Sequence, residues 1–369
     1  MSDNWPEGNA IVYCEGAFGT PNGKTAHGLV RRSERYRLLS IIDSTKAGTD
    51  AGDVLDDKPN GIAVHADLTA ARRAAAEAGM DSGTGATHFI IGLAPDGGRL
   101  PSAGRAALEE AIRAGLDVVS GLHDFVSEDP AFAPLAVEHA VTLVDVRKPP
   151  PRSELHFFSG KIEEVAALKV AILGTDSAVG KRTTAWLLVD ALRQRGHSAE
   201  LIGTGQTAWL QGSRYSIVLD SLVNDFVAGE IEHAVWSAWQ EQRPEIVVLE
   251  GQGSLLNPAY PGGFELLAAG RPEAVILQHA PARSEYDGFP GYAMHPLVRQ
   301  IRAIEIISDR PVIAVTINHE GLDRDAVRAA SASITSETGL PAFDVLREGA
   351  EPLAAIVENL LDRNPEGSS

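Results

Sequence analysis

The stretch GTDSAVGKRTT, at residues 174–184, joins two segments of different periodicity, and this junction limits the possible folds strongly. The preceding KVAILG is typical of a buried strand, and the following KRTTAWLLVDALRQ carries the apolar spacing of a helix. Glycines between a strand and a helix let backbone amides turn toward an anion, and the helix N-terminus and Lys181 add positive charge. The junction therefore predicts a phosphate-binding loop.

The loop departs from the standard phosphate-binding pattern at two places. The standard pattern is Gly, four residues, Gly-Lys and then Ser or Thr. Here five residues separate Gly174 from Gly180, and Arg182 follows the lysine. The missing hydroxyl normally helps to hold magnesium, which a guanidinium cannot do, so we expect a phosphate cradle whose magnesium ligand is in doubt. The predicted cofactor-binding residues are Gly174, Thr175, Asp176, Ser177, Ala178, Val179, Gly180, Lys181, Arg182 and Thr183.

Short apolar runs alternate with helical patterns on both sides of three consecutive prolines, Pro149, Pro150 and Pro151. Runs such as LLSIID and HFIIGLA precede the prolines, and PEIVVLEGQ and EAVILQHA follow them. This alternation predicts parallel sheets covered by helices on both faces, and the prolines predict a break between domains. The expected fold class is α/β, with two domains at residues 1–150 and 151–369, each a mainly parallel sheet with flanking helices.

The composition excludes several classes of partner. The chain has 50 acidic residues against 32 Lys and Arg, and its net charge of −18 argues against nucleic acid or an anionic membrane as the main partner. The N-terminal MSDNWPEGNA lacks the apolar core of a signal peptide. The single Cys14 fits a reducing cytoplasm and is expected in the core. We expect a cytoplasmic, homo-oligomeric protein that acts on a small molecule and has no structural metal site.

Two further loops follow predicted strands of the second domain. Glu250 ends the strand PEIVVLE, where an acid lies near the phosphates in folds of this type; the alternative is an acidic strand end that faces water. The polar loop GTGQT, residues 203–207, follows SAELI and contains Gln206. Because ligands bind at the carboxyl ends of parallel strands, these loops and the phosphate loop should converge.

The first domain offers one candidate loop, GTPNGKTAHG, which contains Lys24 and His27. It imitates a second phosphate loop, but Gly16 and Gly19 have the wrong spacing for one. It remains a plausible active-site loop because it follows a strand. Asp43 ends LLSIID, where Rossmann domains often place an acid on a ribose hydroxyl, but G-x-G-x-x-G is absent and NAD binding is not expected.

Two sets of motifs resemble known enzymes. GTDSAVGK, GTGQT and LEGQGSLLNP resemble loops of dethiobiotin synthetase, an ATP-dependent enzyme. Over nearly the whole chain, KTAHGLVRRSERY, IDSTKAGTDAGDVLD, SGLHDFVSED, GTGQTAWLQG and DFVAGEIE resemble the D-glutamate N-acetyltransferase family. That resemblance implies a Rossmann-like N-terminal domain, a P-loop C-terminal domain, and acetyl transfer from acetyl-CoA to an acidic amino acid. The alternative is ATP with magnesium as the loop's ligand, in a kinase or ligase acting on a small carboxylate.

Acetyl transfer needs a base for the substrate ammonium and cations for its carboxylates. The segment LQHAPARSEYDGFPGY offers His279 as the base and Arg283 as a carboxylate clamp, and Glu250 and Asp225 are the next candidate bases. The alternatives are a hydrogen-bonded loop histidine at position 279 and an exposed helix start at Asp225. The predicted substrate-binding residues are Lys24, His27, Arg283 and Gln206, and we expect one cleft shared by both domains.

Overall fold

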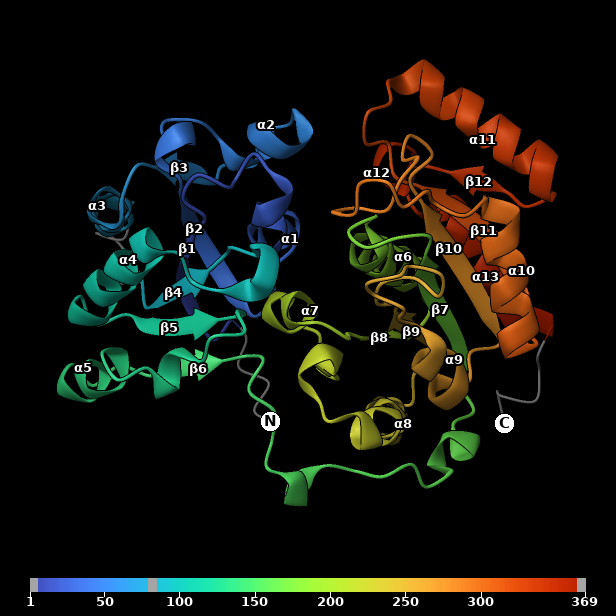
Figure 1. Ribbon diagram of the computed structural model, residues 1–369, viewed down its shortest axis with the longest axis horizontal. Coiled ribbons are helices and arrows are strands. Elements are labelled where there is room, and N and C mark those ends of the chain that lie inside the picture. Colours follow the sequence, from blue (N-terminus) through green and yellow to red (C-terminus); the bar gives the residue numbers. More distant parts are fainter. Residues whose placement is uncertain (1–5, 79–84, 364–369) are drawn as a thin grey trace. The chain divides into compact units, whose positions relative to one another are not determined.

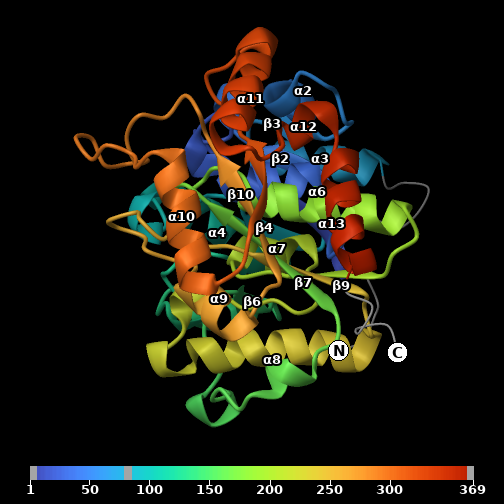
Figure 2. The same cartoon turned by 90° about the vertical axis from the view of Figure 1, so that its right-hand side faces the viewer.

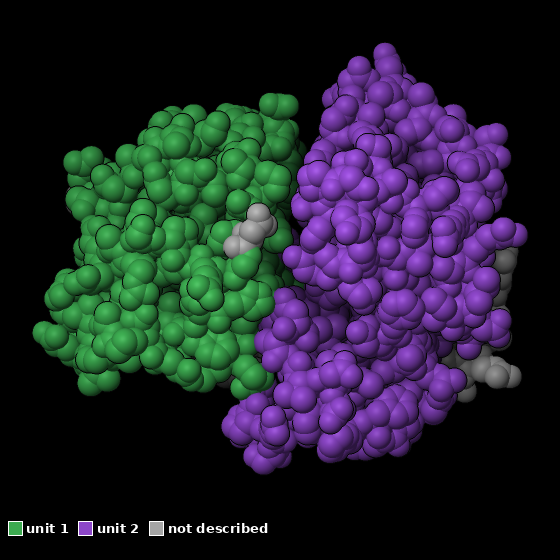
Figure 3. All heavy atoms as spheres, in the orientation of Figure 1, with its two compact units in different colours: residues 1–149, 206–212 green, residues 150–205, 213–369 purple. Residues whose placement is uncertain are grey.

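The computed structural model describes residues 6–78 and 85–363. The chain forms two compact units, coloured separately in Figure 3. Unit 1 consists of residues 1–149 and 206–212, and unit 2 of residues 150–205 and 213–369. The division therefore falls within the run of three prolines, and one short segment from later in the chain belongs to unit 1.

Unit 1 is built on a six-stranded parallel sheet in the order β3-β2-β1-β4-β5-β6 (Figure 1). This order has a switch point between β1 and β4. The strands that follow β1 in sequence are added on one side of it up to β3, and on its other side from β4 onward. The strands are β1 (Gly8–Tyr13), β2 (Tyr36–Ile42), β3 (Ala63–His65), β4 (His88–Ile91), β5 (Asp117–Ser120) and β6 (Leu143–Asp145). The helices are α1 (Lys24–Arg31), α2 (Ala51–Asp56), α3 (Leu68–Ala78), α4 (Ser102–Arg113) and α5 (Phe132–Glu138).

Unit 2 contains a second six-stranded parallel sheet, in the order β12-β11-β10-β7-β9-β8. The strands are β7 (Leu168–Gly174), β8 (Ala199–Ile202), β9 (Ile246–Glu250), β10 (Ala274–His279), β11 (Val312–Ile317) and β12 (Ala342–Phe343). The helices are α6 (Lys181–Gln194), α8 (Asn224–Gln242), α9 (Phe264–Gly270), α10 (Leu297–Ser308), α11 (Arg324–Thr338), α12 (Val345–Glu348) and α13 (Glu351–Arg363).

Two hydrophobic cores cover the two faces of this second sheet. Every residue of β7 is buried, because its alternate side chains enter different cores: Ala171 and Leu173 enter one, and Val170 and Ile172 the other. Helices α6 and α13 pack side by side on the face that carries Val170 and Ile172, as Figure 2 shows. Helices α8, α9, α10 and α11 cover the opposite face, which carries Ala171 and Leu173. The expected α/β fold with parallel sheets is confirmed.

The short helix α7 (Gln206–Gln211) belongs to unit 1, although its sequence lies between two strands of unit 2. The Gln211 side chain donates to the carbonyl oxygen of Gly28 (2.7 Å), and Arg35 donates to that of Trp209 (2.9 Å). The Arg35 guanidinium also lies 3.9 Å from the Trp209 ring centroid. Residues 206–212 thus pack outside the domain to which the sequence analysis assigns them, because their partners are in unit 1.

Other sequence expectations can be compared directly with the described residues. The helix predicted after the phosphate loop coincides with α6, and Cys14 is fully buried in the core of unit 1, as expected. Several elements were not predicted, among them the short strands β3 and β12 and the short helix α7. Among the helices that the structure describes, none has both the length and the apolar character needed to cross a membrane.

Candidate functional site

The phosphate loop runs from the end of β7 to the start of α6, and two of its glycines are required by geometry. A Cβ on Gly174 would lie 2.9 Å from both Cδ and Nζ of Lys181, so a larger residue there would displace the lysine from its place across the strand end. Gly180 has φ +105°, a conformation that other residues rarely adopt. The five-residue spacing therefore still closes a tight strand-to-helix loop.

Lys181 is nearly buried inside this loop, at 8% exposure. Its Nζ donates to the carbonyl oxygens of Asp176 (2.7 Å) and Gly253 (2.8 Å). These contacts hold the ammonium at the N-terminus of α6, where the first backbone N–H groups have no partner within the helix. A lysine charge and a helix N-terminus at one place can bind an anion such as a phosphate.

Asp176 joins the phosphate loop to two neighbouring loops. Its carboxylate accepts hydrogen bonds from the Asn257 side chain (2.8 Å), from Arg283 Nη1 (2.9 Å) and from the backbone N–H of Asp287 (2.9 Å). These partners lie after β9 and β10, so a single fully buried carboxylate fixes the loops that follow three adjacent strands. The role that the structure gives Asp176 is to hold the site together.

Arg283, the expected carboxylate clamp, is engaged by two carboxylates of the protein. Besides the bond to Asp176, its Nε and Nη2 both donate to the same Glu320 oxygen, at 3.0 and 2.6 Å. The Arg283 side chain is only 14% exposed, whereas that of Glu320 is 53% exposed. Arg283 can clamp a substrate carboxylate only if Glu320 gives way, so its substrate role stays a prediction.

Glu250 ends β9 and is buried. Its carboxylate accepts the backbone N–H of Thr204 (2.9 Å), and the Thr204 hydroxyl donates to the Glu250 carbonyl (2.9 Å). Burial raises the pKa of Glu250 above its ordinary value, while the charges of Arg182 and Lys181 oppose that rise. The loops after β8 and β9 therefore converge beside the phosphate loop, as the sequence predicts.

His279 ends β10, and its Nδ1 lies 3.0 Å from the Thr175 hydroxyl of the phosphate loop. Burial lowers the pKa of His279 to about 4, because the charged imidazolium loses its hydration. The imidazole is therefore neutral at neutral pH and can accept a proton, although so low a pKa makes it a weak base.

The remaining predicted site residues are Asp225 of unit 2 and Lys24, His27 and Gln206 of unit 1. Asp225 is exposed in the first turn of α8, and Lys24 is exposed as the first residue of α1. His27 Nε2 lies 2.8 Å from the carbonyl oxygen of Phe18, and this contact stabilises the segment between β1 and α1. Gln206 is buried in α7, and its side chain packs close to Gly121 of unit 1. Their functional roles stay predictions.

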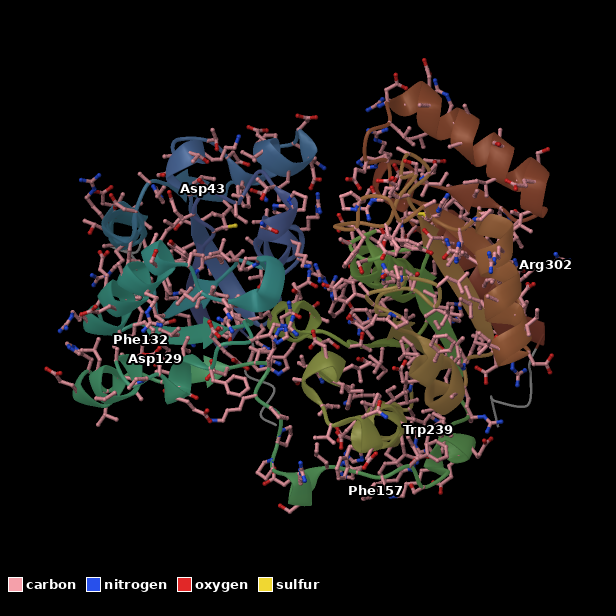
Figure 4. The ribbon with its side chains drawn as sticks, in the orientation of Figure 1. Asp43, Asp129, Phe132, Phe157, Trp239 and Arg302 are labelled. Atoms are coloured by element: carbon pink, nitrogen blue, oxygen red, sulfur yellow. The ribbon has the colours of Figure 1, made fainter. Side chains whose placement is uncertain are left out.

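At the switch point of unit 1, the loops after β1 and β4 are bonded to each other. The N–H of Ala94 donates to the carbonyl of Asn22 (2.7 Å), and that of Ala26 to the carbonyl of Gly92 (3.0 Å). Asp43, at the end of β2 (Figure 4), accepts the N–H of Phe18 (2.9 Å) from the loop after β1. These hydrogen bonds hold the segments after β1, β2 and β4 to one another and so stabilise unit 1.

Sequence reasoning missed the loop that follows β11, where Asn318, His319 and Glu320 form a polar run. Asn318 Nδ2 donates to the carbonyl oxygen of Val179 in the phosphate loop (2.9 Å), and Glu320 binds Arg283. A polar run directly after the apolar strand RPVIAVTIN was the available signal. Among the described residues, no group of three or more His, Cys, Asp or Glu side chains is arranged to hold a metal ion.

The comparisons with known proteins agree with this architecture. A P-loop domain described as a domain of unknown function, DUF1611, matches residues 156–354, and the Rossmann-like N-terminal domain of the same family matches residues 44–149. The chain belongs to the DUF1611 family. A crystal structure of a DUF1611 family protein from Anabaena variabilis is similar to it with a TM-score of 0.85 and 28% identity, over 96% of this chain and 100% of that one.

Two relatives of this DUF1611 chain carry the name D-glutamate N-acetyltransferase. The protein from Tritonibacter scottomollicae is 30% identical over 74% of this chain and 82% of its own length. The protein from a Pseudoalteromonas species is 29% identical over 73% of this chain and 81% of its own length.

Proposed function

We propose that this DUF1611 protein is an N-acetyltransferase that moves the acetyl group of acetyl-CoA to the amine of an acidic amino acid, with D-glutamate as the first candidate. The observation that carries the proposal is a phosphate cradle, Gly174 to Lys181, with Arg182 where a magnesium-binding hydroxyl is expected. Coenzyme A presents a diphosphate and a 3′-phosphate, which such a loop can bind without cleaving. The names of the two relatives support the same reaction.

The reaction requires few chemical groups. The substrate ammonium loses a proton to a base, and the amine nitrogen attacks the thioester carbonyl carbon. A C–N bond forms, the tetrahedral oxyanion collapses, and the C–S bond breaks to release coenzyme A, whose thiolate takes up a proton. The protein must therefore supply a base, donors for the oxyanion, and cations for the substrate carboxylates.

Unit 2 contains side chains that can supply some of these groups. Lys181 and the N-terminus of α6 would bind phosphate, and the neutral imidazole of His279 is one candidate base. Glu250, whose pKa burial raises, is another, because a higher pKa brings it nearer the operating pH. Lys24 and Arg283 are the proposed partners of the acceptor carboxylates.

A second candidate ligand is ATP with magnesium, since Glu250 ends the strand beside the phosphate loop, as acids do in nucleotide-cleaving folds. Thermal unfolding distinguishes the two, because a ligand that binds only the native state raises its melting temperature. We expect acetyl-CoA to raise the melting temperature in the presence of EDTA. A rise with Mg-ATP and none with acetyl-CoA would favour the ATP-dependent alternative.

A further inference from the structure

In acetyl-CoA, the pantetheine arm separates the thioester from the phosphates. A loop that binds the phosphates therefore cannot also place the reacting carbonyl within itself. His279 contacts Thr175 of the phosphate loop, so it lies where the phosphates would be held. The base that deprotonates the acceptor amine should lie further along the same edge of the sheet, on a partly exposed side chain.

A histidine that follows β11 meets these conditions. His319 lies in the loop after β11, and its side chain is 31% exposed. Its Nδ1 lies 2.5 Å from Oδ2 of Asp344, whose side chain is only 1% exposed. A buried carboxylate on Nδ1 fixes the ring orientation and the tautomer, so that Nε2 is the nitrogen left to accept a proton.

The loop that carries His319 is bonded to the phosphate site on both sides of the histidine. Asn318 before it donates to the Val179 carbonyl, and Glu320 after it accepts two hydrogen bonds from Arg283. The Asn318 N–H also donates to the carbonyl of His279 (2.7 Å). His319 is thus held at the same sheet edge as the phosphate loop, just beyond β11, the strand that pairs with β10.

We propose that His319 is the general base of the acetyl transfer, through Nε2, and that Asp344 is its positioning residue. This inference rests on the proposed function. In the forward reaction, Nε2 takes a proton from the acceptor ammonium before the amine attacks the thioester. The resulting imidazolium, stabilised by the Asp344 carboxylate, can then return the proton to the departing thiolate of coenzyme A.

Asp344 has a second, structural task, which the test must separate from the first. It is the N-cap of α12, where it accepts the N–H groups of Leu346 (3.0 Å) and Arg347 (3.4 Å). Asparagine caps helices about as well as aspartate. Asp344→Asn therefore keeps the cap and removes the negative charge beside His319. Asp323→Asn is the matched control, because Asp323 caps α11 through Ala326 and has no histidine partner among the described residues.

The experiment measures steady-state transfer from acetyl-CoA to D-glutamate, with kcat and both KM values for each variant. We expect His319→Gln to lower kcat at least about 100-fold and Asp344→Asn about tenfold or more, with the KM for acetyl-CoA within threefold and unchanged melting temperatures. Asp323→Asn should keep the wild-type kcat. His319→Ala should regain activity with added imidazole, a rescue that a purely structural role would not show.

The outcomes distinguish this inference from the proposed function. If the wild-type protein transfers acetyl groups and His319→Gln keeps the wild-type kcat, His319 is not the base, and the proposed function stands. Loss of activity in His319→Gln together with unfolding, and without imidazole rescue of a folded His319→Ala protein, also overturns the assignment. A wild-type protein without any transfer overturns the proposed function and this inference with it.

Discussion

Arg283 and Asp176 form a buried ion pair, with 2.9 Å between Nη1 and Oδ2, that ties the loop after β10 to the phosphate loop. Removing one partner of such a pair leaves a buried charge uncompensated, which costs about 3–5 kcal/mol in typical cases. Here Asn257 and the N–H of Asp287 still donate to the Asp176 carboxylate, so we expect the lower end of that range.

The prediction is that Arg283→Met lowers the free energy of unfolding by about 3 kcal/mol, measured by urea denaturation. Arg302→Met is the control, because Arg302 is an exposed residue of α10 that points away from the sheet (Figure 4), and it should change stability by less than about 0.5 kcal/mol. A fully stable Arg283→Met protein with a raised acceptor KM would instead assign Arg283 to substrate binding.

Lys181→Ala should weaken binding of the phosphate-bearing cofactor. A hydrogen bond to a charged group contributes about 1.5–3 kcal/mol, so we expect the Kd for acetyl-CoA to rise about 10- to 100-fold in calorimetric titration. Lys58→Ala, which removes an exposed lysine of unit 1, should leave the Kd unchanged. An unaltered Kd in a folded Lys181→Ala protein would show that the loop does not bind the cofactor.

Burial of His279 predicts a dependence of stability on pH. The unfolded histidine takes up a proton near pH 6.5, whereas the native pKa is about 4, so the unfolded state binds more protons between these values. The contribution of the neutral imidazole to the free energy of unfolding is therefore fully present above pH 6.5. It is lost as the pH drops toward 4, by about 2 kcal/mol at pH 5. His279→Gln should lose about 2 kcal/mol less than the wild type between pH 7.5 and pH 5. Equal losses would show that His279 titrates normally.

The sequence predicted the fold well because its strongest signals are local. The loop at residues 174–180 needs glycine where Lys181 crosses the strand and where φ is positive, so its spacing alone indicates the structure. The alternation of buried strands and helices likewise follows from period and burial. The placement of α7 could not be predicted, because it depends on partners such as Gly28 and Arg35, far away in the chain.

The candidate site was predicted less completely, because residue type does not show which partner a charge finds. Asp176 and Arg283 are both predicted to contact ligands, but their mutual ion pair inside the protein was not predicted. His319 was missed because its partner, Asp344, lies 25 residues later in the chain. Only the parallel pairing of β11 with β12 brings these two residues together.

Lys24→Ala tests the contribution of unit 1. If Lys24 binds an acceptor carboxylate, its loss should raise the KM for D-glutamate about tenfold and leave kcat unchanged, because the interaction is made equally in the ground and transition states. Lys58→Ala is again the matched control. An unchanged KM would exclude Lys24 from the acceptor site.

We propose that this protein transfers an acetyl group from acetyl-CoA without using magnesium. The most direct measurement follows thiol release from acetyl-CoA by the purified protein with D-glutamate in EDTA, with N-acetylglutamate identified by mass spectrometry. We predict acceptor-dependent thiol release at an undiminished rate in EDTA. Activity that is abolished by EDTA and restored by magnesium, or product formation that requires ATP, would contradict the proposed function.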